Sequence, residues 1–251
     1  MRDIEQALME HKEALIQRGF AENRILGIFL YGSQNYGLAT EASDVDTKAI
    51  IVPTLEELCS FYKPYVHEFE LPNGEKCVAM DIRHLIDNLK KQNINYVEVL
   101  FTKHNWVNPD YESVWASLLA IKEKIAFYDR NRAVQSMAHQ ALHTLKQDPF
   151  NDKKYAQAMY ISHFLHEYIV DEKFRAPYAE MLHPLPHITE PIVEVKTGKT
   201  GHSLGDAYKL RKHFERMIEM KPFEENIELQ KEIDKRMLQI SVMAVRRLEN
   251  L

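Results

Sequence analysis

The sequence is short of cysteine and of long apolar runs. Its 251 residues include two cysteines, Cys59 and Cys77. That is too few for a disulfide framework in a chain long enough to bury a core without one, so we expect two buried free thiols. No segment approaches the roughly 18 to 20 consecutive apolar residues of a membrane span. The first 20 residues show an amphipathic helical pattern without the apolar core of a signal peptide. These absences predict a cytoplasmic protein with no membrane partner.

The sequence also has fewer basic than acidic residues. The chain has 32 Lys and Arg against 37 Asp and Glu, a formal net charge of -5 and a pI of about 6.2. This balance argues against a protein that coats nucleic acid by neutralising many phosphates, and against a processive polymerase. A short contact with RNA stays compatible with it. The 45% of hydrophobic and 27% of charged residues are typical of a globular protein.

The apolar pattern divides the chain into two parts. Residues 3–18 predict a helix, 25–31 and 44–52 predict strands, and 66–71 and 76–82 predict a hairpin around an Asn-Gly turn. Thr54 and Glu57 have the spacing of a capping box, which predicts a short helix after the second strand. Helical spacing dominates from residue 83, over 83–92, 110–124, 131–147, 151–170, 206–220 and 226–249.

We therefore expect an α/β (α+β) fold with a small mixed sheet, followed by a helical region. The expected domains are residues 1–105 and 106–251, with the site in a cleft between them. Residues 174–205 contain four prolines and two glycines, and they predict a long irregular connection of the kind that often carries binding residues.

The chemistry-bearing segment is residues 30–51, LYGSQNYGLATEASDVDTKAII. Gly32 allows a tight turn and a close approach of the backbone to a ligand, and Ser33 can present its hydroxyl and amide to phosphate at a helix N-terminus. On a strand, alternation places Asp44, Asp46 and Lys48 on one face. Two adjacent carboxylates repel each other unless a cation lies between them, and hard oxygen ligands suit Mg²⁺ or Mn²⁺. We expect two such ions per site.

A two-ion site needs a third carboxylate. Asp81 is the candidate because it is the only acid in an apolar strand, and a strand beside the second one could bring it to the same face; alternatively it pairs with Arg83 at the strand end. Lys48 could contact phosphate or form a salt bridge with Asp44 or Asp46. Glu98, in an apolar segment, is expected to pair with a base, the alternative being an acid that orients a metal ligand.

This arrangement resembles the nucleotidyltransferase superfamily typified by DNA polymerase beta. The shared residues are Gly32-Ser33 after a strand, Asp44 and Asp46 on the next strand, and a later acid, here Asp81. Over residues 25–101 the chain is similar to stand-alone bacterial and phage nucleotidyltransferases associated with RNA repair. The resemblance implies that Gly32 and Ser33 hold a nucleoside triphosphate and that the three acids hold two Mg²⁺ ions.

Related proteins carry a Lys, then a His or small polar residue, then an Arg on a later helix. The matching segment here begins at Lys153 and Lys154, which the resemblance implies as triphosphate contacts, but it has Gln157 and Tyr160 in the places of His and Arg. The expected reaction is transfer of a nucleoside monophosphate from an NTP to a hydroxyl, with an RNA 3′ end such as that of a tRNA as acceptor. The alternatives are a protein-nucleotidylating (AMPylating) enzyme, a small-molecule acceptor, or a nucleotide-binding regulatory module without turnover.

Overall fold

A computed structural model describes residues 2–41, 43–60, 63–148, 150–170 and 186–250. The N-terminal part begins with helix α1 (Ile4–Gln17) and builds a five-stranded sheet from β1 (Ile25–Tyr31), β2 (Asp46–Ile51), β3 (Val66–Glu70), β4 (Lys76–Asp81) and β5 (Asn105–Val107). The strand order is β3-β4-β2-β1-β5, with β2 and β4 parallel and the other pairs antiparallel. The fold is therefore mixed α+β with a small mixed sheet, as expected.

Short elements precede, connect and follow the strands. They are the 3₁₀ turns η1 (Glu22–Arg24), η2 (Ser33–Tyr36), η3 (Glu98–Leu100) and η4 (Pro109–Tyr111), and the helices α2 (Leu55–Cys59), α3 (Ile82–Lys90) and α4 (Ile94–Val97). At α2 the Thr54 side chain accepts from the Glu57 amide while the Glu57 side chain accepts from the Thr54 amide. The capping box predicted from the sequence is thus confirmed.

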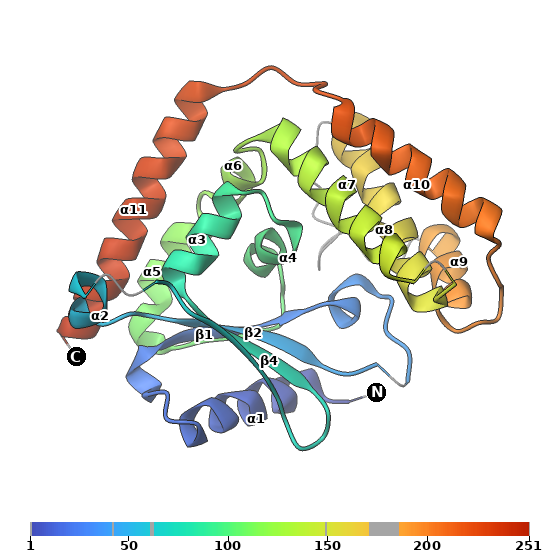
Figure 1. The fold of residues 1–251 in the computed structure, drawn as a ribbon. Helices are drawn as coiled ribbons and strands as arrows, with labels where there is room; N and C mark the ends of the chain where they lie inside the picture. Colours follow the sequence, from blue (N-terminus) through green and yellow to red (C-terminus); the bar gives the residue numbers. More distant parts are fainter. Residues whose placement is uncertain (1, 42, 61–62, 149, 171–185, 251) are drawn as a thin grey trace.

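In the described part of the chain after the sheet, the helices are α5 (Glu112–Leu119), α6 (Lys122–Ala126), α7 (Arg130–Gln147), α8 (Asp152–Val170), α9 (Pro186–Lys196), α10 (Leu204–Glu219) and α11 (Ile227–Glu249). Figure 1 shows α7 to α10 grouped beyond one face of the sheet, whereas α11 runs back toward α5 and α2. No helix of the described ranges is long and apolar enough to cross a membrane.

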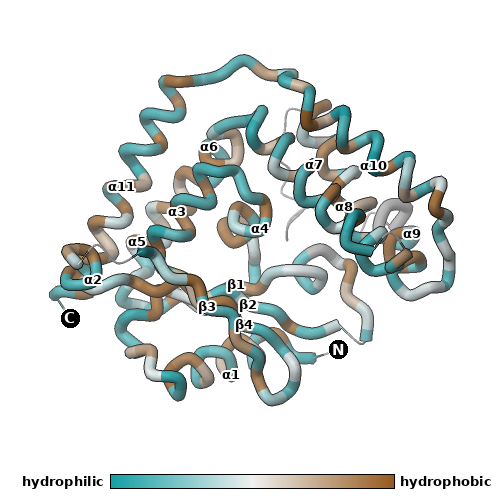
Figure 2. Tube along the Cα trace, in the orientation of Figure 1, coloured by the Kyte–Doolittle hydropathy of each residue, from teal (hydrophilic) through white to brown (hydrophobic). Residues whose placement is uncertain are grey.

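The sheet separates two hydrophobic layers. α1 covers one face, where Leu8 and Leu15 pack with Ile28, Ala49 and other small or apolar strand residues. The other face continues into the helices through a larger cluster that includes Phe29, Ile50 and residues of α3, α7, α8 and α11. Figure 2 shows hydrophobic residues along β1 and β2, in line with their burial. The face of β2 that carries Asp46 is thus the face toward the helices.

The prediction of an irregular connection over residues 174–205 is wrong for its later part. Residues 186–196 form α9, whose buried Ile192 and Val195 face the larger core at helical spacing. Pro186 fits the first helical position, which has no intrahelical partner for its nitrogen, and Pro191 lies inside the helix, where it removes one backbone hydrogen bond. Residues 174–185 lie outside the described residues. The division at residue 105 stays a prediction.

The cysteine expectation is half correct. Both cysteines are free, but only Cys77 is buried, whereas Cys59 at the end of α2 is exposed.

Candidate active site

The site lies where β1 ends and β2 begins. Tyr31 pairs with Asp46 across these antiparallel strands, and Gly32 follows directly. Gly32 has φ +80° and ψ -156°, a conformation that only glycine adopts without strain. A Cβ atom at Gly32 would lie 3.8 Å from Asp46 Oδ2. The Gly32 backbone is therefore immediately beside the carboxylate, as a close approach to a ligand at Asp46 requires.

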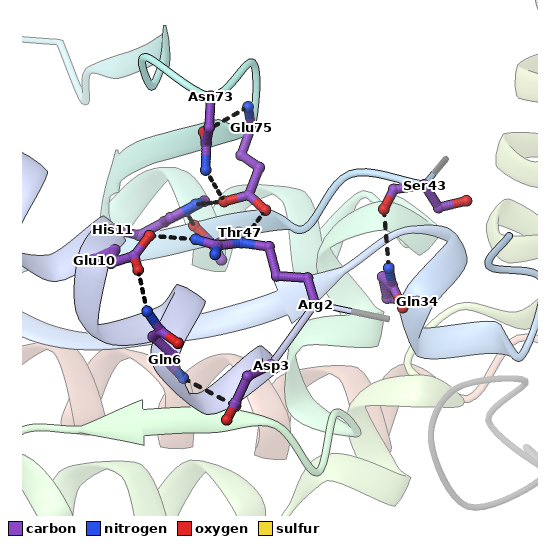
Figure 3. Close-up of polar contacts among 10 residues, drawn as sticks. All are labelled: Arg2, Asp3, Gln6, Glu10, His11, Gln34, Ser43, Thr47, Asn73 and Glu75. Atoms are coloured by element: carbon purple, nitrogen blue, oxygen red, sulfur yellow. Dashed lines mark hydrogen bonds and ion pairs between the residues drawn. The ribbon is translucent and has the colours of Figure 1, made fainter. Parts of the chain in front are cut away.

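Hydrogen bonds fix the loop from Gly32 to Asp44. Ser33 begins the four-residue turn η2, and its carbonyl accepts from the Leu38 amide. Buried Asn35 donates to the Leu30 carbonyl and accepts from the Thr102 hydroxyl. The Gln34 side chain donates to the Ser43 carbonyl at 3.2 Å (Figure 3). The loop is thus tied to the sheet at its start and to itself at its end, next to Asp44.

Asp44 and Asp46 form an interacting pair. Asp44 is exposed just before β2, and Asp46 is half-buried at its first position. Burial raises the pKa of Asp46, and the nearby negative charge of Asp44 raises it further; the backbone amide of Lys76 and the charges of Lys76 and Lys153 act in the opposite direction. Such a pair is more favourable when a cation neutralises it, and carboxylate oxygens suit Mg²⁺ or Mn²⁺.

The structure does not bring Asp81 to this pair. In the parallel ladder Asp81 faces Ile51, at the far end of β2 from Asp46. Five residues of strand correspond to about 16 Å, and the odd interval also turns the side chain to the opposite face of the sheet. Asp81 instead caps α3 by accepting from the Arg83 amide at 2.7 Å, and it pairs with the Arg83 guanidinium. The alternative given above for Asp81, an acid that pairs with Arg83, is the one observed.

Lys48 is not a surface residue. It is 4% exposed, and its ammonium contacts Glu98 at 3.1 Å and lies over the Tyr31 ring at 3.5 Å. Burial lowers the pKa of Lys48, and the Glu98 charge opposes that shift. The expected ion partner was Asp44 or Asp46, and the observed one is Glu98, which confirms that Glu98 pairs with a base. Lys48 is therefore buried next to Asp46 on β2, and its ammonium is not positioned to bind phosphate.

Of the two lysines expected at the start of α8, Lys153 is the one that acts on Asp46. Lys153 is exposed and its charge lowers the pKa of Asp46, while the amide of half-buried Lys154 donates to Asn151. Gln157 is exposed one turn further along the helix and Tyr160 is buried.

A further lysine, Lys196 at the end of α9, was not expected. Its ammonium donates to the Leu38 carbonyl at 2.7 Å and to the Ser43 hydroxyl at 3.3 Å. Ser43 directly precedes Asp44, so the ammonium contacts the neighbour of that acid. Burial lowers the pKa of Lys196, and the charge of Lys153 lowers it further. Two lysines from the helical region thus lie near each other and near the acids. No sequence pattern indicated Lys196, because α9 lies in a proline-rich segment.

Behind the acid-bearing strand lies a buried polar network, drawn in Figure 3. His11 of α1 contacts the Thr47 hydroxyl through Nδ1 at 2.6 Å and Glu75 through Nε2 at 3.2 Å. Glu75 also accepts from Asn73 at 2.8 Å and pairs with Arg2 at 2.5 Å. Because Thr47 follows Asp46, this network fixes the strand that carries the acid. Burial lowers the pKa of His11, and the partner Glu75 opposes the shift.

No protein-family model matches the chain, and no curated protein matches it. Among solved structures it is similar to a nucleotidyltransferase-like protein from Exiguobacterium sibiricum 255-15, at 12% identity over 99% of this chain and 75% of that one, with a TM-score of 0.33. We therefore infer function from the residues of the site.

Proposed function

We propose that this protein is a metal-dependent nucleotidyltransferase that moves a nucleoside monophosphate from an NTP to a hydroxyl group. The observation that supports it most is the placement of Asp44 and Asp46 beside the Gly32 turn, with Lys153 and Lys196 close to them from the helical region. Two hard anionic ligands for a divalent cation and two ammonium groups for phosphate oxygens are what a triphosphate with its cation requires.

In the proposed reaction an acceptor hydroxyl attacks the α-phosphorus. A new oxygen–phosphorus bond forms, the bond to the bridging oxygen breaks, pyrophosphate leaves with that electron pair, and the hydroxyl proton passes to solvent or a nearby carboxylate. When bound on Asp44 and Asp46, Mg²⁺ or Mn²⁺ would supply charge neutralisation at the phosphates. Lys153 and Lys196 would hold the triphosphate, and the Gly32 and Ser33 backbone would line its path.

The acceptor we favour is an RNA 3′ end, such as that of a damaged tRNA. This choice rests on the sequence resemblance over residues 25–101. A protein hydroxyl or a small molecule would use the same transfer chemistry, so the acceptor has to be found by experiment.

The second candidate is a nucleotide-binding module without turnover. It is favoured by exposed Gln157 and buried Tyr160, where related enzymes carry His and Arg, and by the placement of Asp81 away from the other acids. Both candidates require nucleotide binding, and only the first requires release of pyrophosphate.

The acceptor test incubates the protein with each α-³²P-labelled NTP, Mn²⁺ or Mg²⁺, and total RNA or cell protein. Label on RNA in the wild type and its absence in Asp46→Asn would support the RNA acceptor. The matched control is Asp87→Asn, which makes the same substitution at an exposed acid of α3 that pairs with Lys91. Label on protein would replace RNA by a protein acceptor, and nucleotide binding without any transfer would favour the second candidate.

A further inference from the structure

The residue beside Asp46 on the neighbouring strand is a lysine. Thr47 pairs with Cys77 and Lys48 with Val78 in the parallel ladder, so the register sets Lys76 next to Asp46 and on the same face. The Lys76 backbone amide also hydrogen-bonds the Asp46 carboxylate. The position from which a neighbouring strand could most directly add a third carboxylate therefore carries a positive charge.

Lys76 itself lies among acids. Its ammonium contacts Glu68 Oε1 at 3.0 Å, and its register partner on β3 is Glu70. The Lys76 side chain is 46% exposed, so it can face a ligand in solvent. The ammonium is thus held at the edge strand by Glu68, and the charge of Asp46 also acts on it.

This arrangement determines how many cations the site can accept. Mg²⁺ is commonly bound by one or two carboxylates together with substrate phosphates, whereas a pair of ions about 4 Å apart requires more shared anionic ligands. Within the described ranges no group of three or more His, Cys, Asp or Glu side chains is placed to hold a metal ion. The donor set of Asp44 and Asp46 fits one ion and does not fit two.

We propose that the site takes one divalent cation, on Asp44 and Asp46 together with a nucleotide, and that the Lys76 ammonium stands in for a second ion. This proposal rests on the proposed nucleotide-binding function and corrects the expectation of two ions per site. An ammonium on the strand next to Asp46 would neutralise phosphate charge there without needing further carboxylates.

The test counts bound metal independently of turnover. Wild-type protein is passed through gel filtration in buffer containing Mn²⁺ and an ATP analogue with a methylene group between the α- and β-phosphates. Manganese and nucleotide in the protein peak are then counted above the buffer baseline. We expect one Mn²⁺ per bound nucleotide for the wild type and two for Lys76→Glu. The control Lys91→Glu makes the same charge change at an exposed lysine that follows the last residue of α3 and pairs with Asp87, and it should keep one.

A second variant covers the case in which Lys76→Glu fails to fold. Lys76→Gln removes only the positive charge, and it should tighten Mn²⁺ binding in the absence of nucleotide by about fivefold, the Coulomb effect of one unit charge on a divalent cation about 8 Å away in water. Unchanged Mn²⁺ affinity in Lys76→Gln would overturn the proposal. Two Mn²⁺ per nucleotide in the wild type would also overturn it, and would point to Glu68 or Glu70 as a ligand. If neither Mn²⁺ nor the analogue binds the wild type, the proposed function itself fails.

Discussion

Replacing Lys48 by Met should destabilise the protein strongly and in a pH-dependent way. The Lys48 and Glu98 side chains are 5% and 0% exposed and lie 3.1 Å apart, so the substitution removes the Lys48 ammonium from a buried carboxylate. Removing one partner of a buried ion pair costs about 3–5 kcal/mol. Protonation of the buried carboxyl lowers this cost, because the neutral form does not require the Lys48 charge.

The pH dependence follows from that proton. A carboxyl with an ordinary pKa of about 4.3 costs roughly 4 kcal/mol to protonate at pH 7 and about 1 kcal/mol at pH 5. The unfolded state binds fewer protons than the folded variant above pH 4.3, so the deficit grows as the pH rises. At pH 7 a loss of stability of about 4 kcal/mol corresponds to a fall in Tm of roughly 8–16 °C for a chain of this size.

The assay is urea unfolding followed by circular dichroism at pH 5 and pH 7. Lys91→Met is the control, because it removes an exposed lysine paired with Asp87 at 2.5 Å and should change stability by less than about 1 kcal/mol. The double variant Lys48→Met/Glu98→Gln should recover much of the loss, because no charge stays buried. A Lys48→Met deficit below about 1 kcal/mol at pH 7, or one that does not depend on pH, would refute the account of this pair.

Three other predictions follow from the structure. The free energy of unfolding should fall as the pH drops below about 6.5, because burial lowers the pKa of His11 and the imidazole therefore takes up a proton more readily in the unfolded state. His11→Gln should flatten this pH dependence. A variant whose urea midpoint changes with pH as in the wild type would contradict this role of His11. Glu75 contributes in a separate, more acidic window: burial alone would raise its pKa, but hydrogen bonds from Arg2, Asn73 and His11 lower it below the ordinary glutamate range. Asp81→Ala should cost about 1–3 kcal/mol in unfolding experiments and leave ATP affinity in titration calorimetry unchanged, since it caps α3 away from the site; a large loss of affinity would return Asp81 to the site. Gly32→Ala should cost about 1–3 kcal/mol and abolish nucleotide binding, because the backbone angles at this position strain any other residue; normal binding and stability would show that the turn tolerates a side chain.

Much of the fold could be predicted from the sequence because its signals are local. The apolar run before Gly32, the Asn-Gly turn at 73–74 and the capping box at Thr54 each depend on a few adjacent residues, and all three are where they were expected. Asp44 and Asp46 could be predicted in the same way, because they are separated by one residue at the start of a strand.

The errors concern information that is not local. Which residue of β4 lies beside Asp46 depends on strand register, and the observed register selects Lys76 instead of Asp81. The partner of Lys48 depends on the packing of η3 under the sheet. Lys196 lies in a segment whose prolines indicate irregular structure, although buried Ile192 and Val195 hold it as a helix.

The most direct test of the central claim is release of pyrophosphate from NTPs in the presence of Mn²⁺ and the acceptor fraction that takes up label. The account predicts release that requires the metal, is abolished in Asp46→Asn, and is unaffected in Asp87→Asn. Release that persists in Asp46→Asn, or no release from a wild type that binds nucleotide, would contradict the assignment of this site as a nucleotidyltransferase.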